Sequence, residues 1–254
     1  NAERGDVPVA VASSVKLAKL ARILPSVLAV PVPTIGVGAH PDIIAVSSDD
    51  IDGYDLRAAG GLRRVTAANV PLAGAENAKI VAFRPEDGGI EHLAILIGEP
   101  DISAPVLIRL HSECFTGDLL GSLKCDCGEQ LKGAIEQIGN EGAGVLLYLA
   151  QEGRGIGLIN KLRAYALQDQ GFDTVEANQR LGFADDEREF LAAAEMLRQL
   201  GISKVRLLTN NPRKMAQLEE YGIEVAERVE HIFESNQYNE RYLAIKAEKS
   251  GHLF

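Results

Sequence analysis

The stretch "AGVLLYLAQEGRGIGLINKLRAYALQDQG", residues 143–171, decides the fold class of this chain. It opens with a continuous apolar run, which is typical of a strand buried on both faces. A glycine-rich turn follows, and then a helical segment that stops at Gly171, because glycine commonly ends a helix. A buried strand that passes through a short turn into a helix predicts an α/β arrangement.

The segments around this stretch extend the prediction. Short apolar runs broken by proline, glycine and aspartate predict strands at 79–85, 92–100, 104–112, 143–151, 204–209 and 223–229. Helices are expected at 126–142, 158–171, 187–201, 212–222 and 236–252. Strands that come first and then alternate with helices predict a mixed α/β (α+β) domain. Its mixed sheet is flanked by helices and contains at least one parallel pair.

Residues 1–77 differ in character from the rest, and we interpret them as a smaller N-terminal extension of unknown role, followed by a main domain at 78–254. A helix is expected at 13–24 after a serine cap, and a turn with a short helix at 47–65. The acidic run at 49–55 misses the spacing of a calcium loop, so a solvated acidic face is the preferred interpretation.

Composition narrows the function classes. The chain has 254 residues and a formal net charge of -10, which argues against non-specific binding of nucleic acid. No apolar run reaches membrane-spanning length, so no membrane partner is expected. The cysteines are three and closely grouped, which is not a disulfide framework and favours a reducing compartment, the cytoplasm.

All three cysteines, Cys114, Cys125 and Cys127, lie in "HSECFTGDLLGSLKCDCGEQ", residues 111–130. A metal held by three protein ligands keeps a fourth position for water, which is the arrangement of a catalytic zinc. Two alternatives stay open on spacing alone. His111 would close the site as a structural Cys3His zinc, or the three thiols are inert.

Two strand-to-helix junctions have the composition of anion-binding turns. "QEGRGIGL" at 151–158 matches neither the dinucleotide fingerprint nor the P-loop, but its glycines and arginine suit phosphate. At 207–214, "LLTNNPRK", Asn211 suits the helix cap, and Thr209 with Lys214 would face an anion at the helix start. A well-capped helix with a surface lysine is the alternative.

The stretch "GFADDEREF" at 182–190 places carboxylates beside an arginine. It would supply a carboxylate base next to a cation. The alternative is an acidic first turn of the following helix, which the helix dipole favours.

Together these stretches resemble the GTP cyclohydrolase II family, from about residue 79 to the C-terminus. The resemblance rests on residues 109–131, 148–178, 181–189, 207–214 and 242–253, in this order. Residues 1–77 resemble the N-terminal extension of some bacterial members and lack any motif of the dihydroxybutanone phosphate synthase fused in others.

The resemblance implies a hydrolase that opens the imidazole ring of GTP and releases formate and pyrophosphate. Its product would be 2,5-diamino-6-(5-phosphoribosylamino)pyrimidin-4(3H)-one, the first intermediate of riboflavin biosynthesis. It also implies one Zn2+ per subunit held by the three cysteines plus water, Mg2+ with the GTP phosphates, and a homodimer. A GTP-binding regulatory protein or divergent paralogue with a structural zinc is the alternative.

The resemblance also assigns the site residues. Asp186 would be a proton acceptor, Arg188 a nucleophile at the α-phosphate or a transition-state stabiliser, and Tyr165 a proton donor during ring opening. The implied GTP-binding residues are Arg109, Leu110, His111, Ser112, Glu113, Gln130, Glu152, Gly153, Arg154, Thr174, Thr209 and Lys214. Among them Glu152 suits guanine, because a carboxylate can accept from N1–H and the 2-amino group together.

Overall fold

The structure, a computed structural model, describes residues 5–31 and 42–233. It consists of two compact units. The large unit comprises residues 58–158 and 186–233, and the small unit comprises 5–31, 42–57 and 159–185. The helix predicted at 236–252 and the family motif at 242–253 lie outside the described residues.

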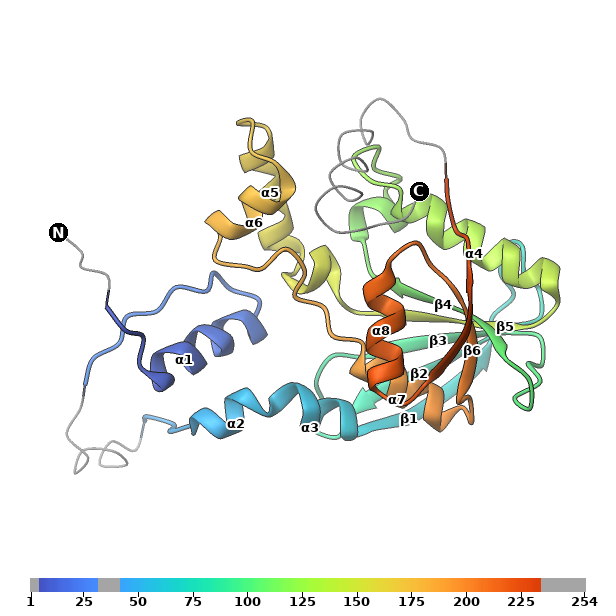
Figure 1. Ribbon diagram of the computed structural model, residues 1–254, viewed down its shortest axis with the longest axis horizontal. Coiled ribbons are helices and arrows are strands. Elements are labelled where there is room, and N and C mark those ends of the chain that lie inside the picture. The colour runs from blue at the N-terminus through green and yellow to red at the C-terminus, as the bar shows by residue number, and fades with distance from the viewer. Residues whose placement is uncertain (1–4, 32–41, 234–254) are drawn as a thin grey trace. The chain divides into compact units, whose positions relative to one another are not determined.

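The large unit contains a seven-stranded sheet in the order β1-β2-β3-β5-β4-β6-β7 (Figure 1). Strands β1, β2, β3 and β5 pair antiparallel, whereas β5, β4, β6 and β7 pair parallel, which confirms the mixed α/β fold class. The strands are β1 Leu62–Asn69, β2 Ala78–Pro85, β3 His92–Ile97, β4 Val106–Ser112, β5 Gly144–Leu149, β6 Lys204–Leu208 and β7 Glu224–Val229.

Helices make the connections of the parallel half. α4 (Cys127–Glu141) joins β4 to β5, and α8 (Pro212–Glu220) joins β6 to β7. α4 ends at Gly142 with a φ of 95°, a conformation that favours glycine. α8 begins as predicted, with the Asn211 side chain accepting from the amide of Arg213 and proline at the first helical position.

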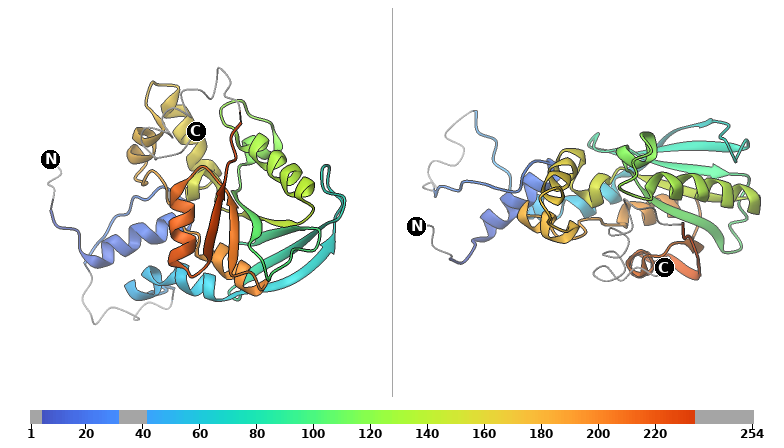
Figure 2. Two further views of the ribbon diagram at one scale, coloured as in Figure 1. Left: turned by 45° about the vertical axis from the view of Figure 1, so that its right-hand side comes forward. Right: turned by 90° about the horizontal axis from the view of Figure 1, so that it is seen from above.

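The strand period of two divides the core between two faces. In β4, Val106, Ile108 and Leu110 belong to a cluster completed by α7 (Leu191–Gln199) and α8. Leu107 belongs to a second cluster with Ala134 and Ile138 of α4. Helices therefore cover both faces of the sheet (Figure 2), and odd-numbered side chains of β4 face α4.

Several predicted boundaries are wrong. The segment 47–65 contains helices α2 (Ser48–Asp52) and α3 (Tyr54–Gly60), but its last residues begin β1, which the sequence analysis did not predict. β1 pairs with β2, so a division at 77/78 would separate two paired strands. The first helix, α1, spans Val9–Leu20 rather than 13–24, and α7 begins at Leu191 rather than 187.

In the small unit, α1 lies against α2, where Ser13 donates to Asp52 over 3.0 Å. Lys16 of α1 also pairs with Asp55, at the start of α3, at 3.0 Å. The unit also holds most of α5 (Leu158–Gln168) and α6 (Thr174–Arg180), which was not predicted. Within the described residues no helix is both long and apolar enough for a membrane crossing.

The small-unit segment 159–185 is inserted between two stretches of the large unit that are close to each other, which we call the neck (Arg154 and Glu187). On its large-unit side, the amide of Glu187 donates to the carbonyl of Arg154 over 3.1 Å. A Cβ on Gly155 would lie 3.1 Å from the Glu187 carbonyl, so the two chain segments are in close contact.

Candidate functional site

The predicted motifs meet at the carboxyl ends of the parallel strands. β4 ends at Ser112 and is followed by the loop that carries Cys114 and Cys125, here called the cysteine loop (113–126). β5 ends at Leu149 before the glycine-rich turn, and β6 ends at Leu208 before the cap of α8. Because parallel strands end at one edge, side chains that follow them converge there. This edge is where open α/β sheets bind ligands.

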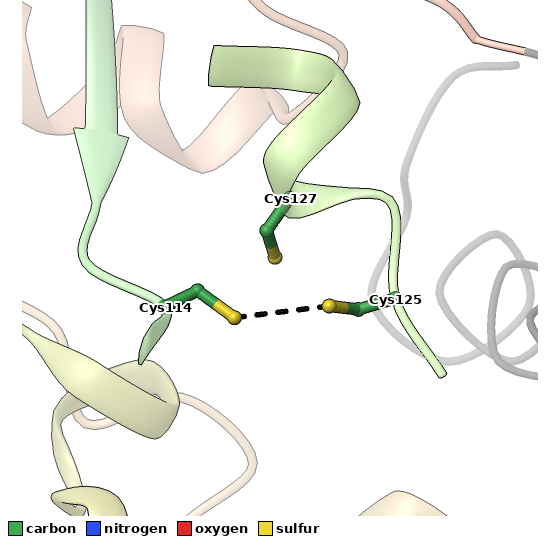
Figure 3. Close-up of side chains that lie close together, drawn as sticks. All are labelled: Cys114, Cys125 and Cys127. Carbon is green, nitrogen blue, oxygen red and sulfur yellow. Dashed lines mark hydrogen bonds between the residues drawn. The ribbon is translucent and has the colours of Figure 1, made fainter. Parts of the chain in front are cut away.

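Three thiols form the centre of the site (Figure 3). Cys114 follows β4, Cys127 begins α4 and Cys125 precedes it, with the three Sγ atoms within 4.8 Å of one another. The Cys114 and Cys125 sulfurs lie 3.7 Å apart. Sulfur atoms placed tetrahedrally about 2.3 Å from a zinc ion would lie about 3.8 Å apart, so the cluster fits a metal.

A glycine gives the thiols their space. A Cβ on Gly117 would lie 2.9 Å from the Sγ of Cys125 and 3.1 Å from that of Cys114. The hydrogen bond with Cys114, followed by burial, raises the pKa of Cys125 to about 11, and the contact with Cys114 also raises the pKa of Cys127. Neighbouring thiolates repel one another, and a divalent cation would remove that repulsion.

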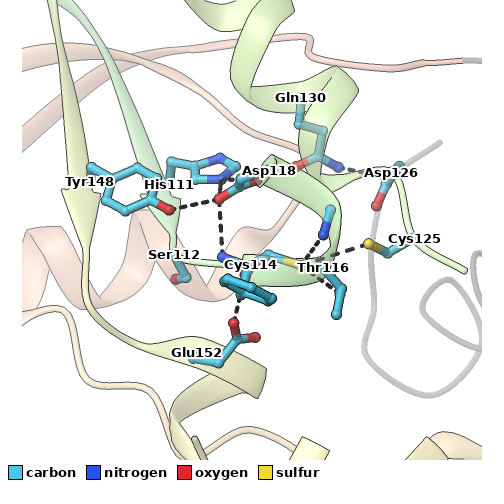
Figure 4. A network of polar contacts seen from close by, with 12 residues as sticks. His111, Ser112, Cys114, Thr116, Asp118, Cys125, Asp126, Gln130, Tyr148 and Glu152 are labelled. Atoms are coloured by element: carbon cyan, nitrogen blue, oxygen red, sulfur yellow. Dashed lines mark hydrogen bonds and ion pairs between the residues drawn. The ribbon is translucent and has the colours of Figure 1, made fainter. Parts of the chain in front are cut away.

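His111 does not belong to the thiol cluster. Its Nε2 atom lies 3.0 Å from Asp118 Oδ1, and among the described residues the metal-compatible group consists of the three cysteines (Figure 4). Burial lowers the pKa of His111, against the opposing effect of Asp118. A carboxylate only accepts, so Nε2 carries the proton and cannot bind a metal. This geometry does not support the Cys3His alternative.

Two buried cations lie beside the cluster. Arg109 donates to the carbonyl of Leu208 over 2.8 Å and to the side chain of Gln130, and burial lowers its pKa to about 10. Its Nε atom is buried and has no hydrogen-bond partner. Lys214 donates to the carbonyl of Leu110 over 2.7 Å. Buried cationic groups favour binding of an anion.

Asp186 and Arg188 form a bidentate pair. The carboxylate of Asp186 accepts from Arg188 Nε at 2.8 Å and Nη2 at 2.7 Å. Burial would raise the pKa of Asp186, but the hydrogen bonds and charge of Arg188 outweigh it and lower that pKa to about 2. Both residues precede α7, whose first turn has no acidic residue, so the helix-dipole alternative is wrong.

The turn after β5 is held against the cysteine loop. Glu152 is buried, and its carboxylate accepts from the amide of Phe115 over 2.6 Å and from that of Gly153 over 2.9 Å. Arg154 has a φ of 63°, which is rare for a residue with a side chain and costs on the order of 1 kcal/mol. Such backbone strain persists where the surroundings enforce it, commonly at functional sites.

The other predicted residues divide between the large unit and the small unit. Leu110 is a core residue on the α7 face, and only its carbonyl reaches the site, through Lys214. The Thr209 hydroxyl accepts from the amide of Asn211 over 3.0 Å. Tyr165 and Thr174 lie in the small unit, on α5 and at the start of α6. The remaining predicted residues all belong to the large unit, namely Arg109, His111, Ser112, Glu113, Cys114, Cys125, Cys127, Gln130, Glu152, Gly153, Arg154, Asp186, Arg188, Thr209 and Lys214.

Sequence reasoning missed three side chains at this edge. Asp118 accepts from His111 and from Tyr148, and His231 contacts the carbonyl of Gln130 at 2.9 Å. Strand alternation signals Tyr148, because it lies opposite His111 in the register and on the same face. Nothing in the spacing of Asp118 or His231 signals a contact.

His231 predicts a pH-dependent stability. Burial, followed by the charge of Arg109, lowers its pKa to about 3. An unfolded histidine titrates near pH 6.5, so the unfolded state binds the proton first, and stability present above that pH falls as the pH decreases. This histidine should lower the free energy of unfolding by about 2 kcal/mol between pH 7.5 and 5.0. Denaturant unfolding of His231→Gln should show a decrease in the free energy of unfolding between pH 7.5 and 5.0 that is smaller by that amount. A pH dependence equal to that of the wild type would show that His231 is not the group responsible.

The fold and site define a class, α/β proteins with a ligand site at the carboxyl ends of parallel strands. The sequence model of the GTP cyclohydrolase II family matches residues 63–230. A GTP cyclohydrolase-2 from Enterobacter sp. (strain 638) is 55% identical over 192 residues, which are 76% of this chain and 97% of that protein. This chain therefore belongs to the GTP cyclohydrolase II family, which confirms the resemblance found in its motifs.

Two longer relatives show the same similarity. GTP cyclohydrolase-2 of Azospirillum brasilense is 60% identical over 248 residues, 95% of this chain and 64% of that protein. Riboflavin biosynthesis protein RibBA of Synechocystis sp. is 50% identical over 213 residues, 83% of this chain and 38% of that protein. The chain thus spans less than two thirds of the length of either.

Proposed function

We propose that this protein hydrolyses GTP at the imidazole ring and at the α-phosphate, releasing formate and pyrophosphate and leaving the diaminopyrimidinone ribosyl phosphate of riboflavin biosynthesis. The observation that carries the proposal is the thiol cluster of Cys114, Cys125 and Cys127 at one strand edge with the buried cations Arg109 and Lys214. Metal ligands and an anion site are the two features that this reaction requires. Family membership supports the same assignment.

The three cysteines would hold one zinc ion. When bound, zinc supplies a Lewis acid and lowers the pKa of a water molecule toward neutrality. The chain contributes the shape of this centre, since Gly117 leaves space beside the sulfurs and His111 is committed to Asp118.

GTP would be oriented by its two ends. Its triphosphate, together with Mg2+, would lie near Arg109, Lys214 and Thr209, where the buried cations attract an anion. Its guanine would be recognised by Glu152, because a carboxylate can accept from N1–H and the 2-amino group together; in the structure this carboxylate accepts from the backbone amides of Phe115 and Gly153. The roles of Tyr165 and Thr174, which lie in the small unit, stay predictions. The homodimer and the cytoplasmic location also stay predictions.

Arg188 would act as a charged stabiliser of the α-phosphate rather than as a nucleophile. A carboxylate with a pKa of about 2 is a weak base, and an arginine side chain is not deprotonated in proteins, so the transfer of a proton from Arg188 to Asp186 is strongly unfavourable. The bidentate contact instead holds the guanidinium in one orientation.

Asp186→Asn separates these two roles. The asparagine oxygen can still accept from Arg188, so loss of one charge-assisted bond should slow pyrophosphate release about tenfold. Removal of a general base would slow it by about 10² to 10⁴. Quantifying pyrophosphate from zinc-loaded wild type and variant decides between the roles, and a loss of about 10² or more contradicts the stabiliser role.

The direct test of the proposed function is product analysis. Zinc-loaded protein incubated with GTP and Mg2+ should release formate and pyrophosphate in equal amounts, and the product mass should be that of the ring-opened monophosphate. Metal content and GTP binding should be measured on the same sample. Protein that binds zinc and GTP but leaves the nucleotide unchanged would overturn the proposal in favour of a regulatory protein.

A further inference from the structure

Asp118 contacts three hydrogen-bonding groups, His111, Tyr148 and Cys114 (Figure 4). Its carboxylate lies 3.0 Å from His111 Nε2 and accepts from the Tyr148 hydroxyl over 2.9 Å. It also accepts, over 3.0 Å, from the backbone amide of Cys114. These donors come from β4, β5 and the loop itself, and the Asp118 side chain is only 7% exposed.

The donors are themselves fixed by the sheet. His111 and Tyr148 are opposite each other in the parallel register of β4 and β5, and their rings stack with centroids 5.5 Å apart. Both strands are largely buried, so these two side chains form a rigid platform. Asp118 connects this platform to a single atom of the loop, the amide nitrogen of Cys114.

The connection matters because Cys114 is separated from the other thiols in sequence. Cys125 and Cys127 lie at the start of α4, whereas Cys114 lies at the beginning of a loop that contains a π-helical turn, Phe115–Leu119. The Cys114 sulfur accepts from the amide of Gly117 over 3.4 Å, within that turn. Its position therefore depends on how the turn is anchored.

We propose that Asp118 is a positioning residue of the metal centre, which anchors Cys114 to the His111–Tyr148 platform and thereby sets the distance between its sulfur and those of α4. The inference rests on the proposed metal site. It assigns a role in metal binding to a residue that contacts neither the metal nor the substrate.

Zinc affinity measured by chelator competition tests the proposal. Asp118→Ala should bind zinc about 10- to 100-fold more weakly, the range seen when outer partners of metal ligands are removed. Asp118→Asn should lose part of the affinity, because an amide has one accepting oxygen where the carboxylate has two. Tyr148→Phe is the matched control, since it removes a donor to Asp118 but leaves the bond to Cys114, and its loss should be smaller than that of Asp118→Ala.

A second readout separates positioning from general destabilisation. The thiolate-to-metal absorption bands of Co2+-substituted protein should change in the Asp118 variants and change less in Tyr148→Phe, while circular dichroism shows a retained fold. If Asp118→Ala does not fold, the Asp118→Asn result decides in the same way. If the Asp118 variants keep the zinc affinity and the Co2+ spectrum of the wild type, the role of Asp118 is overturned but the proposed function is not. If the wild-type protein itself binds no zinc, the proposed function is overturned.

Discussion

Replacing Cys125 with serine (Cys125→Ser) is expected to remove bound zinc and to slow formate release from GTP by at least about 10³-fold, because loss of the metal forfeits several kcal/mol of transition-state stabilisation. Serine is isosteric with cysteine, but its hydroxyl is not a thiolate ligand at neutral pH. The chain contains only three cysteines, so no other thiol can replace Cys125. Metal analysis and a formate assay on the same preparation measure both effects.

The matched control is Leu123→Ser, a substitution in the same loop. The Leu123 side chain is 57% exposed and has no thiol, so this variant should keep its zinc and its formate release. A Cys125→Ser protein that retains both would show that the cluster is not the metal site.

The second large effect is expected for Arg188→Ala, which should slow pyrophosphate release by about 10³-fold or more, the range for arginines that stabilise phosphoryl transfer. Formate release should fall much less, because Arg188 contacts Asp186 and Ser112 rather than a cysteine. Arg188→Lys should recover part of the rate, since it keeps the charge but loses the bidentate contact. Both products must be quantified over one time course.

Arg213→Ala is the control for the loss of a positive charge. Arg213 lies 3.7 Å from Asp186 and its side chain is 51% exposed, so solvent screens it and its removal should have little effect. If Arg188→Ala lowers formate and pyrophosphate equally, the division of labour between Arg188 and the thiol cluster is wrong.

Most of the large unit could be predicted because its strands are buried. β5 is a continuous apolar run and β4 begins with one, and such runs indicate strands whatever their neighbours are. β1 escaped prediction because only Leu62 is buried, and its other residues are exposed or half-buried without alternation. α6 escaped for another reason, since its start depends on a capping box between Asp173 and Glu176 rather than on an apolar stripe.

The site was predictable where chemistry is written into residue type and spacing. Three cysteines within one loop indicate a metal whatever the fold. Leu110 shows the limit of assigning a continuous segment, because strand alternation turns its side chain into the core while its neighbours Arg109 and His111 face α4. Asp118 could not be predicted from spacing, since its contact with Tyr148 exists only once β4 and β5 are paired.

The neck at Arg154 and Glu187 has a consequence for how this architecture can diversify. The intervening segment, 159–185, contributes no strand to the seven-stranded sheet, and its two ends are clamped together within the large unit. Insertions, deletions or an exchange of that segment with another protein therefore leave the strand register untouched. Evolution or protein engineering can therefore change the segment 159–185 as a unit while the thiol cluster and the Asp186–Arg188 pair stay in place.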